Sequence, residues 1–117
     1  MKIAFQVMVQ PYTYEDLDTV IHMAEAALKR GHQVTIFLFA DSVLAINKLV
    51  KPVRTDRNIP EKMKELASKG VKIEICGICM DYRGITQEMI VEGSRPSGLP
   101  EVASLFANFD RFVSLMG

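Results

Sequence analysis

The chain has 117 residues, and its 14 Lys and Arg side chains balance its 14 Asp and Glu side chains, so the formal net charge is zero. A neutral chain has no long-range attraction for nucleic acid or for an anionic membrane, and we expect neither as a partner. The length and the 49% hydrophobic content indicate one globular domain over residues 1–117, and the apolar run at residues 34–40 is far shorter than the ~20 residues of a membrane span.

The first half of the chain alternates apolar strands with helices. Lys2–Val9 is rich in Ile, Phe, Val and Met and predicts a buried strand, which the loop Gln10–Tyr14 follows. Apolar residues recur with helical spacing over Glu15–Arg30, which predicts an amphipathic helix. Gln33–Phe39 is almost continuously apolar, as in a strand of a parallel sheet that is covered on both faces. A short helix then extends to Leu49.

The second half contains a clear helix and strand, followed by a weaker pattern. Pro60 opens a helix that runs to Lys69, and Val71–Ile75 is the next buried strand. Residues 86–91 predict a helical turn, with Met89–Val91 as a short strand. The remaining segments are a polar loop at Lys51–Asn58, a loop at Gly93–Gly98, a helix over Pro100–Phe109 and a closing strand at Arg111–Leu115.

This alternation of strands and helices predicts a three-layer α/β/α fold around a mainly parallel sheet of four to five strands. In such sheets, ligands bind at the edge formed by the carboxyl ends of the strands. Three predicted loops meet that edge, namely Gln10–Tyr14, Ala40–Ser42 and Cys76–Gly84. We therefore expect Cys76 on the side of the molecule where ligands bind.

Both cysteines of the chain, Cys76 and Cys79, come directly after the strand Val71–Ile75. The start of the chain does not resemble a signal peptide, so we expect a cytoplasmic protein. In that compartment a Cys-x-x-Cys pair favours redox, metal or sulfur-transfer chemistry over a structural disulfide. A helix N-terminus or a cation such as Arg83 stabilises the reactive thiolate. The alternative is that both thiols are small buried apolar groups.

The residues after the cysteine pair have chemical or structural interpretations. Arg83 either holds an anionic sulfur on Cys76 or only pairs with Asp81 or Glu88. The Asp81 carboxylate is better suited to capping the turn than to acting as a general base. Gly84 most simply provides the backbone conformation that a tight turn requires.

Other chemistries find less support in the sequence. Zinc needs four ligands, and beyond the two cysteines the chain offers only His22, inside a helix, and His32, at the opposite edge of the sheet, so we expect no metal site. Thioredoxin-like exchange between Cys76 and Cys79 lacks a suitably placed proline and the strand order of that fold. Tyr12 either lines a pocket near Cys76 or merely covers the sheet edge, and its loop lacks the glycines of a phosphate cradle.

Several segments in order resemble the DsrE/DsrF-like family of small sulfur-relay proteins, and within it the YchN-like group. The block Cys76-x-x-Cys79-x-Asp81-x-Arg83-Gly84-Ile85 is the most specific part of the resemblance. The other matching segments are Pro11-Tyr12, the helix end Lys29-Arg30-Gly31-His32 before the strand Val34–Phe39, Gly70-Val71, and the ending Phe109-Asp110-Arg111-Phe112-Val113. One departure is that Thr13 follows Tyr12, where the family usually has glycine.

The resemblance implies a compact α/β/α domain that assembles into homo-oligomers, as trimers or hexamers. It implies that Cys76 carries sulfur as a persulfide, because this residue stands at the matching distance before Arg83-Gly84. Cys79 matches the second cysteine of the YchN-like group. No cofactor is expected.

We therefore expect a sulfur carrier that accepts sulfane sulfur on Cys76 and passes it between donor and acceptor proteins. Two alternatives stay open at this point. One is a non-enzymatic oligomeric scaffold or regulatory subunit, and the other is a dithiol redox protein that cycles a Cys76–Cys79 disulfide.

Overall fold

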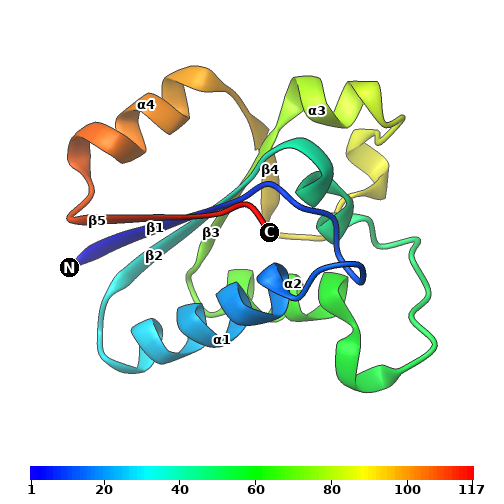
Figure 1. Ribbon diagram of the computed structural model, residues 1–117, viewed down its shortest axis with the longest axis horizontal. Helices are drawn as coiled ribbons and strands as arrows, with labels where there is room; N and C mark the ends of the chain where they lie inside the picture. The colour runs from blue at the N-terminus through cyan, green and yellow to red at the C-terminus, as the bar shows by residue number, and fades with distance from the viewer.

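The computed structural model describes all residues from 1 to 117 and contains a five-stranded, all-parallel sheet with the strand order β4-β3-β2-β1-β5 (Figure 1). The predicted α/β fold with a parallel sheet of four to five strands is thereby confirmed. The strands are β1 (Lys2–Val7), β2 (Gln33–Leu38), β3 (Lys72–Cys76), β4 (Ser94–Ser97) and β5 (Arg111–Leu115).

Helices cover both faces of the sheet, with α1 and α2 on one side and α3 and α4 on the other (Figure 1). The helices are α1 (Asp16–Lys29), α2 (Ile59–Ser68), α3 (Gly77–Tyr82) and α4 (Leu99–Asn108), and short 3₁₀ segments lie at η1 (Ala40–Ile46), η2 (Thr55–Arg57) and η3 (Gln87–Met89). The predicted helix up to Leu49 is therefore a shorter 3₁₀ segment. None of the helices combines the length and the hydropathy needed to cross a membrane.

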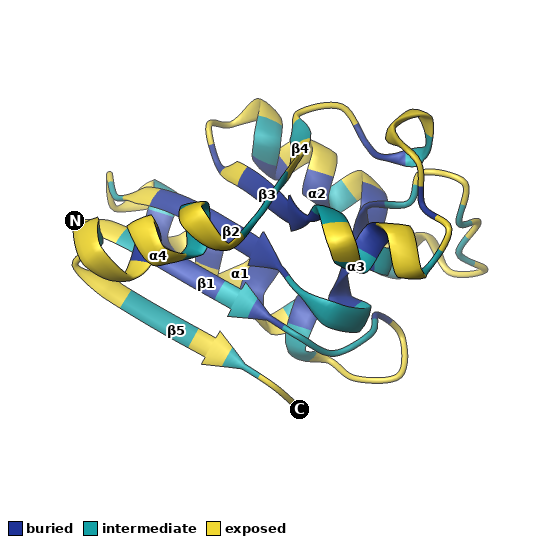
Figure 2. Cartoon of the chain, turned by 90° about the horizontal axis from the view of Figure 1, so that it is seen from above, coloured by how far each residue is buried: buried dark blue, intermediate teal, exposed yellow.

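The core lies mainly between the sheet and the α1–α2 layer. The strands β2 and β3 are buried along nearly their whole length, as Figure 2 shows, because they occupy the middle of the sheet. On α1, the buried residues recur with helical spacing, at Leu17, Val20, Ile21, Ala24 and Ala27. The amphipathic face predicted for this helix is therefore the face that packs.

Two predictions for the weak segment of the chain were wrong. Residues 94–97 form the edge strand β4, which pairs in parallel with β3, where we expected a loop. Pro96 is compatible with this position because an edge strand leaves one side without ladder hydrogen bonds. The short strand expected at Met89–Val91 is absent: η3 ends at Met89, and Ile90 forms only an isolated bridge with Asn47.

Candidate functional site

The two cysteines lie at the carboxyl end of β3, where the chain turns into α3. Cys76 is the last residue of the strand and also the N-cap of the helix, with only 7% of its surface exposed. Its Sγ accepts a hydrogen bond from the Cys79 N–H at 3.4 Å. Both cysteines are free thiols, and Cys79 is partly exposed. A short helix, α3, thus begins directly after Cys76.

A second backbone donor reaches the pair from the loop after β2. The Ala40 N–H donates to the Cys79 Sγ at 3.3 Å. Ala40 has a φ of 55°, in the left-handed region that non-glycine residues rarely adopt. The two loops Ala40–Ser42 and Cys76–Gly84, which we expected at the same edge of the sheet, are therefore in contact.

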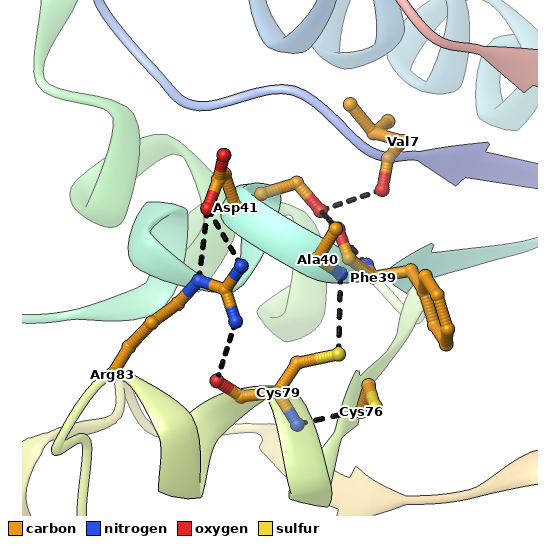
Figure 3. A network of polar contacts seen from close by, with 8 residues as sticks. Val7, Phe39, Ala40, Asp41, Cys76, Cys79 and Arg83 are labelled. Atoms are coloured by element: carbon orange, nitrogen blue, oxygen red, sulfur yellow. Dashed lines mark hydrogen bonds and ion pairs between the residues drawn. The ribbon is translucent and has the colours of Figure 1, made fainter.

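Arg83 joins these two loops (Figure 3). Its Nε and Nη2 donate to one carboxylate oxygen of Asp41, at 2.9 and 2.7 Å, and its Nη1 donates to the Cys79 carbonyl at 3.0 Å. The ion pairs that we considered with Asp81 or Glu88 are not formed. The guanidinium thus ties α3 to η1 at the position of Cys79.

Ser42 fixes the same loop from its other side. Its side chain is fully buried, accepts the Phe39 N–H at 2.8 Å and lies 2.6 Å from the Val7 carbonyl at the end of β1. These contacts anchor the start of η1 to the sheet, so the Ala40 N–H has a defined direction.

The environment of Cys79 raises the pKa of its thiol above the ordinary value of 9.0. Burial is the largest cause, followed by a side-chain hydrogen bond with Cys76. The Ala40 N–H and the charge of Arg83 act in the opposite direction but do not outweigh these causes. Cys79 therefore keeps its proton at neutral pH.

Tyr12 does not lie beside the cysteines. It lines a hollow of about 340 Å³ together with Lys51, Arg54 and Arg57, and neither cysteine contributes to this hollow. The Tyr12 hydroxyl accepts the Ile59 N–H at 3.2 Å, and the Arg57 guanidinium lies 5.5 Å from the centre of its ring. Tyr12 thus packs beside the start of α2 and contributes to a basic hollow of its own.

Asp81 and Gly84 lie at the far end of α3. The Asp81 side chain is exposed, and its carbonyl accepts the Gly84 N–H at 3.2 Å. The capping role predicted for the Asp81 carboxylate is not observed, and the side-chain cap of α3 is Cys76 at its N-terminus. Gly84 has a φ of 67°, so it provides the tight turn as expected.

A buried carboxylate on the same strand was missed in the sequence. Glu74 precedes Cys76 by two residues and so points to the same face of the sheet. Its two oxygens accept hydrogen bonds from Arg95 at 3.0 Å and Ser97 at 2.9 Å. Ser97 is also the neighbour of Cys76 across β4 and β3. This carboxylate is therefore fully partnered beside the cysteine.

Ala40 contacts Cys79 and Asp41 contacts Arg83, and the sequence alone did not indicate either residue as part of the site. The available signal was their position directly after β2, at the carboxyl edge that also carries Cys76. Neither histidine joins the site: the His22 ring contacts the Asp18 carbonyl, and the His32 ring contacts the N-terminal amine. No group of three or more His, Cys, Asp and Glu side chains is arranged to hold a metal ion.

Comparisons with known proteins match this chain to one family. A model of the DsrE/DsrF-like family matches residues 1–115. The "Putative sulfurtransferase DsrE" of Allochromatium vinosum is 32% identical over 90 residues, which are 75% of this chain and 69% of that protein. Protein YchN of Escherichia coli is 26% identical over 106 residues, which are 89% of this chain and 90% of that protein.

The comparison of folds also matches this chain to YchN. The crystal structure of YchN from E. coli matches this structure with a TM-score of 0.91 at 26% identity, covering 98% of this chain and 99% of that chain. The resemblance inferred from the cysteine block is thus confirmed by family, by relatives and by fold. The chain belongs to the DsrE/DsrF-like family.

Proposed function

We propose that this protein carries sulfane sulfur on Cys76 and passes it to a partner protein. The proposal rests on the two sulfur atoms, each of which accepts a backbone N–H, at 3.4 Å for Cys76 and 3.3 Å for Cys79. Such donors stabilise anionic sulfur, whether it is a thiolate or a persulfide. The relative that is named a sulfurtransferase supports the same class of chemistry.

Loading exchanges one sulfur–sulfur bond for another. The Cys76 thiolate attacks the outer sulfur of a donor persulfide, the donor's S–S bond breaks, and its electron pair leaves with the donor thiolate. The outer sulfur keeps its own charge or proton, so Cys76 becomes a persulfide. Delivery repeats the exchange, because an acceptor thiolate attacks that outer sulfur and the Cys76 thiolate leaves. Neither step consumes an oxidant or a reductant.

Cys79 has a slower, competing role in this scheme. Its thiolate attacks the inner sulfur of the Cys76 persulfide, hydrosulfide leaves, and a Cys76–Cys79 disulfide forms. A thiol reductant must then supply two electrons to restore the pair. Because the pKa of Cys79 is raised by burial and by its hydrogen bond with Cys76, this release is slow at neutral pH and the sulfur stays loaded.

The test is to incubate the reduced protein with a persulfide donor and to measure its intact mass. We expect a gain of one sulfur atom, about 32 Da, because the Cys76 thiolate captures sulfane sulfur from the donor. The gain should be absent in Cys76→Ser and present in Cys79→Ser. Near-ultraviolet circular dichroism of both variants checks that the fold is intact.

The remaining outcomes of this experiment separate the alternatives. A loss of two hydrogens without added sulfur would indicate a dithiol redox pair. No mass change in the folded wild type would indicate the scaffold or regulatory role. Sulfur retained in Cys76→Ser would move the carrier to Cys79 and overturn the assignment.

A further inference from the structure

Asp41 lies at the centre of the contacts that hold α3 against the β2–η1 loop. It is the carboxylate partner of Arg83, whose remaining donor binds the Cys79 carbonyl. The residue before it, Ala40, donates its N–H to the Cys79 sulfur. The same short loop therefore binds α3 twice at Cys79, once through a side-chain ion pair and once through the backbone (Figure 3).

The geometry of Arg83 indicates a positioning role. Three of its nitrogen atoms are engaged, two with Asp41 and one with the Cys79 carbonyl. Only 27% of its side-chain surface is exposed, against 51% for Asp41. A planar guanidinium held in this fork fixes both direction and distance, which a lysine ammonium does not.

The backbone of Ala40 supports the same conclusion. A φ of 55° strains a residue that carries a Cβ, so this conformation persists only where neighbouring contacts enforce it. Here the contacts are the buried Ser42 hydroxyl at Phe39 on one side and the Asp41–Arg83 pair on the other. The strained conformation is the one that directs the Ala40 N–H at the Cys79 sulfur.

We propose that Asp41 is a positioning residue for the cysteine pair: acting through Arg83, it keeps α3 against η1 so that the Ala40 N–H donates to the Cys79 sulfur. The inference rests on the proposed function only in taking this pair as the reactive centre. Through this contact, Asp41 governs how readily Cys79 becomes a thiolate, and hence how fast a loaded sulfur is released as hydrosulfide.

The test uses Cys79 as the single thiol, in a Cys76→Ser background, and measures its alkylation by iodoacetamide from about pH 7 to pH 10, because only the thiolate reacts. The rate at low pH is divided by the rate at high pH, which removes any change in access to the sulfur. In Asp41→Asn this ratio should fall about two- to fivefold, since the thiolate loses a charge-assisted hydrogen bond and the reaction at pH 10 lies further below its plateau.

The direction in which the rate ratio changes distinguishes a positioning effect of Asp41 from a direct effect of its negative charge. Besides the mutated Cys76, the charged or titratable groups on α3 and on the elements packed against it are Asp41 of η1, Lys72 and Glu74 of β3, and Asp81, Tyr82 and Arg83 at the end of α3. Removing the negative charge of Asp41 would by itself favour the thiolate and raise the ratio. A fall in the ratio therefore reports the lost Ala40 contact.

Two further variants complete the design. Arg83→Lys keeps the positive charge but loses the fork, so it should lower the ratio as Asp41→Asn does, and combining both changes should add little. Asp18→Asn is the matched control, because Asp18 holds Arg57 through the same pair of donor atoms without contacting either cysteine. Its ratio should equal that of the parent.

An unchanged or raised ratio in folded Asp41→Asn and Arg83→Lys would overturn the proposal, as would an equal fall in Asp18→Asn. Alkylation needs no sulfur donor, so this result is independent of sulfur loading. A wild type that takes up no sulfur would remove the proposed function and leave the positioning result standing.

Discussion

At the scale of single residues, the proposed function implies that the protonation of Cys79 sets how long sulfur remains on Cys76. Burial and the hydrogen bond with Cys76 raise the pKa of Cys79 above 9.0, so its thiolate fraction is small at neutral pH and increases as the pH rises. We therefore expect release of hydrosulfide from the loaded protein to accelerate with pH through the alkaline range, about tenfold per pH unit well below that pKa.

The measurement follows hydrosulfide and the Cys76–Cys79 disulfide together after removal of free donor. Cys79→Ala should hold its sulfur with little dependence on pH, because it has no second thiol to attack the persulfide. Release at equal, pH-independent rates in both proteins would contradict this role for Cys79.

At the scale of elements, the packing of α2 against the segment that leads into β4 depends on one glycine. Gly93 has a φ of 91°, and a Cβ at this position would lie 2.6 Å from the Ala67 Cβ on α2. Gly84, with a φ of 67°, has nothing within 4 Å of such a Cβ. Both positions therefore need a positive φ, but only Gly93 lacks space for a Cβ.

Gly93→Ala should therefore destabilise the protein by about 2–4 kcal/mol, since backbone strain and overpacking add. Gly84→Ala should cost about 1–2 kcal/mol, for strain alone. Denaturant unfolding measures both values. In the Ala67→Gly background the cost of Gly93→Ala should shrink toward that of Gly84→Ala, and an unchanged cost would show that the contact with Ala67 is not the cause.

The same elements show what the sequence can and cannot predict. A nearly continuous apolar run identifies β2, because a strand buried on both faces needs few polar residues. The apolar residues Val71, Ile73 and Ile75 identify β3. Residues 94–97 contain arginine and proline and are a strand only because β3 lies beside them. At the site, Cys76 at the end of β3 was predictable from local pattern. The pairing of Asp41 with Arg83 was not, because it joins residues 42 positions apart through the tertiary fold.

At the scale of the whole molecule, α4 is largely exposed beside the edge strand β5 (Figure 2), and its exposed residues include apolar ones. Leu99 is 72% exposed and Phe106 is 63% exposed, and the Phe106 ring stacks on Phe112 of β5 with 4.1 Å between ring centres. An exposed apolar patch at an unpaired sheet edge is typical of a surface that another protein covers. This surface is where we place the contact of the homo-oligomer that the family resemblance implies.

Light scattering of the wild type should accordingly give a mass of several times the 13.1 kDa of one chain. Phe106→Asp should lower that mass toward 13.1 kDa, because a buried, unpaired carboxylate opposes the contact. Val53→Asp introduces the same charge at a fully exposed apolar side chain in the loop before α2, and should leave the mass unchanged. A monomeric wild type would contradict the predicted assembly, whereas an oligomer that survives Phe106→Asp would place its contact on another face.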